Sequence, residues 1–180
     1  GSSGWDGLFG GNGDDRLFGN GGDDWLNGGS GNDVINGGTG IDTVDYSDAA
    51  GGITLNLSST RGQRTGGSGT DTVTNVENVN GSSFNDRLTG NGLVNQLDGN
   101  GGNDQLFGMG GNDILTGGLG DDLIDGGIGI DMANYADAVA GVAVNLSLAG
   151  AQDTVGSGID TLVSIENIDG SGFNDALTGN

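Results

Sequence analysis

Large aliphatic residues recur along the first part of the chain at intervals of nine positions. They stand at positions 8, 17, 26, 35 and 44, and the six residues between successive three-residue segments are mainly Gly, Asn and Asp. Gly, Asn and Asp are typical of turns, because they tolerate backbone conformations that other residues avoid. The spacing therefore predicts very short strands centred on Leu8, Leu17, Leu26, Ile35 and Val44, joined by six-residue turns.

These segments share one template, G-G-x-G-x-D-x-U-x, in which U is a large apolar residue. The template returns from Gly99 to Asn134, and isolated units end in an Asp elsewhere. The sixth position is held by Asp6, Asp15, Asp24, Asp33, Asp42, Asp71, Asp86, Asp104, Asp113, Asp122, Asp131, Asp160 and Asp175. A common phase over so many units indicates a common role, beyond solubility or local turn hydrogen bonding.

A longer repeat of 89 residues lies over the short one. The shift aligns Tyr46 with Tyr135, Asp71 with Asp160 and Glu77 with Glu166, without a gap. We therefore expect two homologous units, residues 1–89 and 90–180, each with a nonapeptide block followed by a longer irregular coil. We expect them to form one continuous solenoid, as a fragment of a longer array.

The nonapeptide resembles that of the repeats-in-toxin (RTX), or haemolysin-type calcium-binding, family. The resemblance covers nearly the whole chain and rests on about a dozen units in one phase. It implies an all-β fold, the right-handed parallel β-roll, in which two units make one coil. It also implies calcium ions between stacked turns, bound by Asp carboxylates and by carbonyls of the Gly-rich positions that precede each Asp.

The alternative fold is a meander of hairpins, since Asn-Gly pairs are strong hairpin signals. Strands of about three residues are too short for stable hairpins, and identical units bury identical residues best when like stacks on like. Stacking predicts one row of Leu8, Leu26 and Val44 and a facing row of Leu17 and Ile35. It also predicts stacked Asp pairs 18 residues apart: Asp6/Asp24, Asp24/Asp42, Asp15/Asp33, Asp86/Asp104, Asp104/Asp122 and Asp113/Asp131.

The composition excludes several classes of protein. The chain has 43 Gly, a net charge of −21, and no Cys, His or Pro, and all four of its basic residues are Arg. The chain therefore cannot contain a disulfide framework, a thiolate or His metal site, a Ser-His-Asp triad or a Walker lysine. So acidic a chain repels nucleic acid, and it has no apolar stretch long enough to span a membrane. We find no nucleophile-base pair and expect no enzymatic activity.

Calcium fits the remaining donors, because it takes six to eight oxygen ligands in a flexible geometry. Magnesium demands a stricter octahedron, and softer metals prefer the missing His and Cys. We expect about six to ten ions. The resemblance implies, beside the thirteen Asp, carbonyl ligands at or near Gly11, Gly13, Gly22, Gly29, Gly31, Gly38, Gly40, Gly67, Gly69, Gly102, Gly111, Gly118, Gly120, Gly127 and Gly129. Asn95 replaces the sixth-position Asp, so the sites that it shares with Asp71 and Asp113 should be weak.

The irregular segment is predicted to continue the coil. Residues 47–52 should form a turn on the edge of Asp33, and the turn 66–71 should stack on that of Asp42. Val73, Val76 and Val79 are three residues apart, which suggests one longer, bent strand. Glu77 and Glu166 are 89 residues apart, which favours one structural hydrogen bond made twice over an acid/base pair.

These features predict a calcium-dependent structural module. One buried aliphatic residue in nine makes a thin core, so calcium must contribute to folding. In the family, such arrays belong to larger secreted bacterial proteins, are exported unfolded by type I secretion and fold outside the cell beside an enzyme, toxin or adhesin domain. The partners expected are calcium ions and adjoining domains of the same polypeptide. The alternative is an extracellular polysaccharide- or surface-binding β-solenoid, in which exposed aromatic residues stack on sugars.

Overall fold

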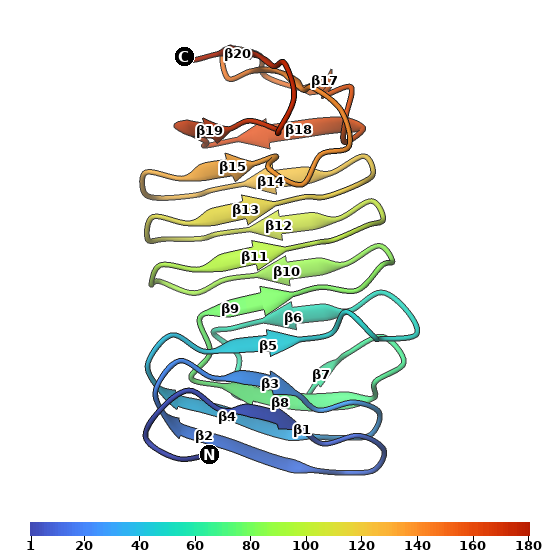
Figure 1. Cartoon of the computed structure of the whole chain (residues 1–180), viewed down its shortest axis with the longest axis vertical. Coiled ribbons are helices and arrows are strands. Elements are labelled where there is room, and N and C mark those ends of the chain that lie inside the picture. Colours follow the sequence, from blue (N-terminus) through green and yellow to red (C-terminus); the bar gives the residue numbers. More distant parts are fainter.

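A computed structural model describes residues 1–180. The chain forms 20 strands and no helix, and its coils stack along one axis from the N-terminal to the C-terminal end (Figure 1). All strands but two pair in parallel with their neighbours; the exceptions are β7 (Gln63–Arg64) and β17 (Ala151–Asp153). The predicted all-β parallel β-roll is therefore confirmed, and the hairpin meander is wrong. No helix is present that could span a lipid bilayer.

One face of the roll is a single eight-stranded sheet that runs through both halves of the chain. Its strands, in spatial order, are β1 (Gly7–Phe9), β3 (Trp25–Asn27), β5 (Thr43–Asp45), β9 (Asn78–Asn80), β11 (Gln96–Asp98), β13 (Ile114–Thr116), β15 (Met132–Asn134) and β19 (Asn167–Asp169). Each strand carries one inward side chain, because side chains alternate between the two faces of a strand.

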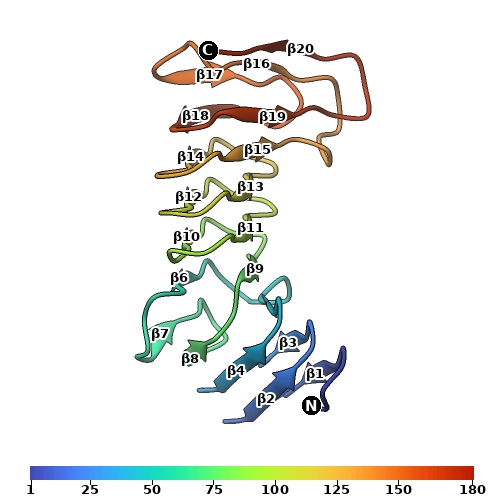
Figure 2. The same cartoon turned by 90° about the vertical axis from the view of Figure 1, so that its left-hand side faces the viewer.

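The opposite face is divided into three sheets. The first comprises β2 (Arg16–Gly21), β4 (Val34–Thr39), β8 (Thr70–Thr74) and β7. The second comprises β17, β18 (Ile159–Val163), β14 (Leu123–Asp125), β12 (Gln105–Phe107), β10 (Arg87–Thr89) and β6 (Thr54–Asn56), and the third pairs β16 (Ala143–Asn145) with β20 (Ala176–Thr178). Figure 2 shows these divisions from the side.

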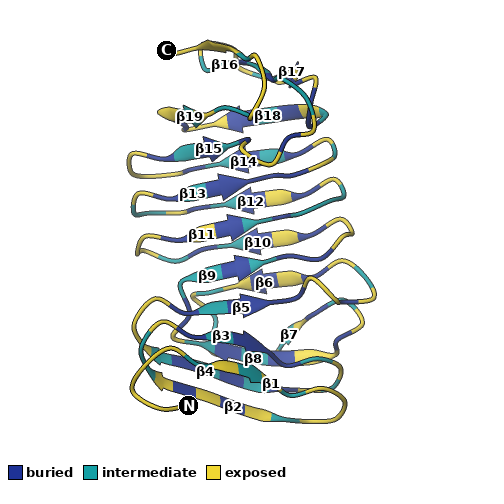
Figure 3. Cartoon of the chain, viewed as in Figure 1, coloured by how far each residue is buried: buried dark blue, intermediate teal, exposed yellow.

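The core is a ladder of aliphatic side chains between the two faces. Leu26 pairs with Leu8 on one side and Val44 on the other, and Ile35 pairs with Leu17, so both predicted rows are confirmed. The rows continue through Leu97 and Leu106 in the second half, both fully buried. Buried residues mark the strand centres and exposed residues mark the turns (Figure 3). Like residues stack on like, which gives each short strand the burial that it lacks alone.

The irregular segment departs from chain order. β8 turns back to pair with β4, with Val73 beside Ile35, while β9 pairs with β5 through Val79 and Val44. The turn 66–71 therefore stacks on that of Asp33, and the prediction that it stacks on that of Asp42 is wrong. The cause is the excursion through β6, which pairs onward with β10 and leaves the position beside β4 to β8. The nine-residue spacing of the sequence cannot reveal that the order of strands in space differs from their order along the chain.

The predicted long, bent strand is in fact two strands, β8 and β9. They are separated by Asn75, whose φ of 51° lies in the left-handed region and changes the chain direction. The second unit repeats the arrangement 89 residues later, where β18 pairs with β14 and β19 with β15. Ser164, which corresponds to Asn75, has the same φ of 51°.

Candidate metal centres

The six-residue turns stack along the two edges of the roll. The first edge carries the turns that end in Asp6, Asp24, Asp42, Glu77, Asn95, Asp113, Asp131 and Glu166. The second edge carries the turns that end in Asp15, Asp33, Asp71, Ile53, Asp86, Asp104, Asp122, Asp160, Val142 and Asp175. The turn 47–52 lies on the second edge as predicted, with the turn 66–71 between it and Asp33.

The sixth-position carboxylates form hydrogen-bonded ladders along these edges. In each step, Oδ1 of one Asp accepts the backbone N–H of the Asp one coil before it. The donor–acceptor distance is 2.8 Å for Asp24 to Asp42 and for Asp104 to Asp122. All six predicted pairs are stacked neighbours of this kind. The ladder fixes each carboxylate in one orientation.

The second carboxylate oxygen has no partner in eight of the turns. Oδ2 is buried without a hydrogen bond in Asp15, Asp24, Asp33, Asp42, Asp104, Asp113, Asp122 and Asp131. A buried charge without a partner costs far more than a lost neutral hydrogen bond. Eight orphaned oxygens at equivalent positions are therefore available as ligands for a cation.

A backbone carbonyl lies close to six of these oxygens at the first glycine of the template, those of Asp15, Asp24, Asp42, Asp104, Asp113 and Asp131. A Cβ built on Gly99 would lie 2.3 Å from Asp104 Oδ2 and 2.6 Å from the carbonyl oxygen of Gly117. At Gly108 the corresponding distances are 2.4 Å to Asp113 Oδ2 and 2.6 Å to the Gly126 oxygen. Two acceptors thus point toward one place with no donor between them. Sequence reasoning missed these first-position glycines, although they are as regular as the second and fourth.

The second and fourth glycines of the template let neighbouring turns approach closely. All the glycines predicted as ligands have positive φ except Gly129. At Gly31, with φ of 144°, a Cβ would lie 2.0 Å from the carbonyl oxygen of Gly13 in the next coil. Only Gly adopts this conformation freely and also leaves that space empty.

Burial raises the pKa of five of the eight carboxyls with an orphaned Oδ2 in the metal-free chain, those of Asp33, Asp42, Asp104, Asp113 and Asp122. The pKa reaches about 7 for Asp104 and for Asp122, and about 6 for Asp113, with desolvation as the main cause in each. Neighbouring carboxylates add to the shift; Asp122 acts on Asp104, and Asp131 acts on Asp113. A bound cation would lower these pKa values again, because it stabilises the charged carboxylates where solvent cannot.

In three turns, which we call closed turns, a serine at the second template position donates a hydrogen bond to the Asp carboxylate. The Ser82 N–H donates to Asp86 Oδ2 at 2.6 Å, and its hydroxyl donates to Oδ1 at 2.7 Å. Ser2 N–H donates to Asp6, and the Ser171 hydroxyl donates to Asp175. The sequence places all three Asp among the expected ligands, and the serine at the second position was not used to separate them from the others.

Two buried tyrosines close two further turns. The Tyr46 hydroxyl donates to Asp71 Oδ2 at 3.0 Å, and Tyr135 donates to Asp160 Oδ2 at the same distance. Thr154 also donates to Asp160 Oδ2, at 3.1 Å. Four of the thirteen predicted ligands, Asp6, Asp71, Asp86 and Asp160, therefore receive a protein donor at Oδ2, where eight others receive none. The serine donor to Asp175 is received at Oδ1.

Glu77 and Asn95 occupy the first edge between the two blocks. Glu77 accepts the Asp42 N–H at 3.0 Å, and Glu166 accepts that of Asp131 at 2.9 Å, which confirms the predicted structural role. Asn95 lies next to Glu77 and not next to Asp71, because the turn of Asp71 stacks on the opposite edge. The predicted neighbour of Asn95 was therefore wrong. Its Nδ2 donates to the Glu77 carbonyl at 2.8 Å, which satisfies the position without a metal.

The donor set fits calcium. No group of three or more acidic side chains gathers at one point, so carboxylates alone cannot form a site and carbonyls must complete it. The available donors are all oxygens, which calcium prefers, and two stacked Asp carry the charge of one Ca²⁺. The residues that would hold it are the eight Asp with an orphaned Oδ2, together with carbonyls of the glycine-rich turns.

Comparison with known proteins agrees with this geometry. The family model of the RTX calcium-binding nonapeptide repeat matches the chain in four copies, over residues 1–44 and 98–133. These two ranges contain all eight Asp whose Oδ2 is orphaned. No curated protein matches the sequence. The chain therefore carries RTX calcium-binding nonapeptide repeats in both blocks.

Proposed function

We propose that the chain is a calcium-dependent structural module of a larger secreted bacterial protein. It stays unfolded in the calcium-poor cytosol, passes through a type I secretion system and folds outside the cell. Its folded roll then supports an adjoining enzyme, toxin or adhesin domain of the same polypeptide. In this proposal the repeats themselves catalyse no reaction.

The observation that carries the proposal is the set of eight orphaned carboxylate oxygens. In seven of these carboxylates the other oxygen already accepts a hydrogen bond from the stacked neighbour; the exception is Asp15, which begins the second edge. Without a cation the folded roll retains this electrostatic cost, and its thin core has little with which to offset it. Metal binding and folding are therefore coupled. A change from low to high calcium, as on export, would act as the folding signal.

The experiment is circular dichroism of the chain in excess chelator and in millimolar calcium. We expect a disordered spectrum in chelator and a β-rich spectrum in calcium, with a cooperative transition, because an inner turn such as that of Asp104 takes part in two stacked pairs. Magnesium and sodium at matched ionic strength are the controls and should do far less. Sodium only screens the charges and does not replace the bonds between calcium and its ligands, and magnesium demands a stricter octahedral geometry. A full β spectrum in chelator would contradict the proposal.

A further inference from the structure

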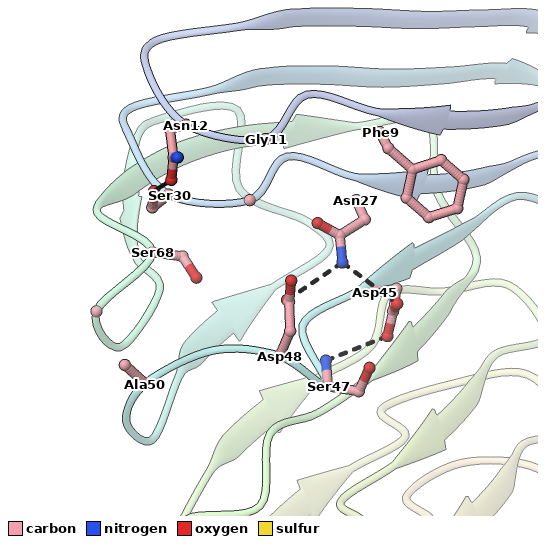
Figure 4. Close-up of a pocket in the computed structure, with 12 residues that line it drawn as sticks. Phe9, Gly11, Asn12, Asn27, Ser30, Asp45, Ser47, Asp48, Ala50 and Ser68 are labelled. Atoms are coloured by element: carbon pink, nitrogen blue, oxygen red, sulfur yellow. Dashed lines mark hydrogen bonds between the residues drawn. The ribbon is translucent and has the colours of Figure 1, made fainter.

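The first unit has a pocket beside its eight-stranded sheet. Gly11, Gly29 and Gly67, which are among the expected calcium ligands, contribute to its lining, and none of its other lining residues belongs to an expected calcium site. Its volume is about 560 Å³, and side chains of successive coils, Phe9, Asn27 and Asp45, line it together with Asp48 from the excursion (Figure 4). Turns of the second edge contribute Ser30 and Asn12 to the far wall. A volume of several hundred Å³ is typical of pockets that bind small molecules.

The polar side chains of this pocket are held in place by one another. Asn27 is 8% exposed, and its Nδ2 donates to Asp45 Oδ2 at 3.3 Å and to Asp48 Oδ1 at 3.2 Å. The Trp25 indole N–H also donates to Asp45 Oδ2, at 3.3 Å, and the Ser47 N–H donates to Asp45 Oδ1. Asn27 Oδ1 points away from the two carboxylates, toward Asn12 and Ser30, and accepts no hydrogen bond (Figure 4).

These groups define the chemistry of a complementary ligand. The pocket offers several acceptors, including two carboxylates, and no Arg lines it. A ligand must therefore supply hydrogen-bond donors and carry no negative charge. Phe9 forms another wall and is 72% exposed, so the ligand must also present an apolar face. A metal ion could use the carboxylates, but it would leave the aromatic ring without a partner.

A sugar ring combines a face of C–H groups with a rim of hydroxyl donors. We propose that this pocket binds a pyranose ring of an uncharged polysaccharide, with Phe9 against the C–H face and Asp45, Asp48 and Asn27 Oδ1 accepting from hydroxyls. Aromatic rings contribute most to recognition when they offer a flat apolar surface beside polar groups. The calcium-loaded module would then also attach to a glycan.

The second unit serves as an internal control for this proposal. At a shift of 89 residues, Phe9 becomes Asp98, Asn27 becomes Thr116 and Asp45 becomes Asn134, while Asp48 becomes Asp137. There the Asn134 Nδ2 donates to the Thr116 hydroxyl at 3.1 Å, and no aromatic ring is present at the position of Phe9. The sugar site is therefore confined to the first unit.

The test uses the calcium-loaded chain in a Trp5→Phe background, so that the fluorescence of Trp25 reports on Asp45. The probes are cellobiose, mannobiose and lactose, with glucuronic acid as a charged comparison. We expect at least one neutral disaccharide to change the emission saturably, with a dissociation constant on the order of 1 mM. Phe9→Ala should weaken binding about tenfold, and Phe9→Asp, which copies the second unit, should abolish it. The matched control is Phe18→Ala, on the opposite sheet and outside this pocket, which should bind as the parent does.

Several results would overturn the proposal. One is the absence of a saturable response to any neutral probe; another is an equal loss of binding in Phe9→Ala and Phe18→Ala. A third is that Asp48→Asn removes one calcium ion while no sugar binds, which would make the pocket a metal site. If Phe9→Ala does not fold, Asp48→Asn replaces it and should also weaken sugar binding. Circular dichroism of the same samples separates a failure of this proposal from a failure of calcium-dependent folding.

Discussion

The turns of Asp86 and Asp104 are neighbours on one edge of the roll, yet they are completed in different ways. Asp86 N–H donates to Asp104 Oδ1 at 2.7 Å, so both belong to the same ladder. Asp86 Oδ2 accepts the Ser82 N–H, whereas Asp104 Oδ2 is buried with no partner. The difference teaches that the backbone ladder alone does not determine which carboxylate oxygens stay without a partner. A carboxylate is available for a cation only where its own turn supplies no donor.

The same difference, between a carboxylate oxygen without a partner and one that accepts a hydrogen bond, separates the nonapeptide blocks from the irregular segments that follow them. The blocks around Asp24 and Asp113 contain orphaned oxygens, while the excursions after each block are closed by Tyr46 and Tyr135. The roll thus alternates blocks with orphaned carboxylate oxygens and junctions that contain their own donors. Calcium should control the blocks strongly and the junctions weakly.

Asp104→Ala should have the largest effect. This residue takes part in two stacked pairs, with Asp86 and with Asp122, so its removal weakens two sites. We expect the calcium midpoint of folding to rise by more than about tenfold, and the transition to become less cooperative. Circular dichroism during calcium titration measures both.

The matched control is Asp137→Ala, which removes the same charge from an exposed turn. Asp86→Ala should shift the calcium midpoint less than Asp104→Ala does, because Ser82 already satisfies the carboxylate. Equal shifts for Asp86→Ala and Asp104→Ala would remove the distinction between open and closed turns.

Protons should partly replace calcium in the metal-free chain. The folded-state pKa of Asp104 and of Asp122 is raised to about 7, and that of Asp113 to about 6, above the usual value near 3.8. A raised pKa means that the folded state binds protons more tightly than the unfolded state does. Folding is therefore favoured as the pH falls through 7 and 6 toward about 4, and disfavoured above pH 7. In chelator, the β signal should increase from pH 8 to pH 5; a decrease over that range would contradict the assignment.

Tyr46→Phe should destabilise the first junction without changing the calcium stoichiometry. It leaves the buried Asp71 Oδ2 without its hydroxyl donor, which costs about 1–3 kcal/mol. Urea unfolding at saturating calcium measures the loss, and isothermal titration calorimetry counts the ions. Tyr135→Phe, which removes the equivalent donor to Asp160, should behave alike. Gain of an ion in either variant would show that the tyrosine blocks a site that calcium can use.

Asn95→Asp should have the smallest effect, the gain of at most one ion. The change replaces an amide that donates to the Glu77 carbonyl with a carboxylate that can share a cation with it. Affinity for calcium should rise slightly, and stability in chelator should fall, because two acceptors then face each other. An unchanged calcium titration with the fold intact would count against the stacking of Glu77 on Asn95.

The sequence was sufficient to predict the regular blocks. A period of nine sets the rows of Leu26 and Ile35 and the pairs such as Asp104/Asp122, because identical units have one efficient way to stack. It was insufficient for the order of the excursion. Whether the turn of Asp71 follows Asp33 or Asp42 depends on where β6 packs, and this is decided by contacts far apart in sequence, such as Tyr46 with Asp71.

The closed turns show a second feature that the sequence alone did not predict. The template at Asp86 differs from that at Asp104 at its second, third and fourth positions. Only the distance from Ser82 to Asp86 reveals the consequence of the serine at the second position. The aromatic pocket was likewise not predictable, because Phe9, Asn27 and Asp48 come together only after the excursion folds against the coils.

The central claim is that the eight orphaned Oδ2 atoms are calcium ligands. Crystals grown in calcium, measured for anomalous scattering, test it most directly. We predict six to ten ions between stacked turns, each beside at least one of Asp15, Asp24, Asp33, Asp42, Asp104, Asp113, Asp122 and Asp131, and none in the loops 58–65 and 147–154. Two or fewer ions between turns, or ions bound away from these eight carboxylates, would contradict the account.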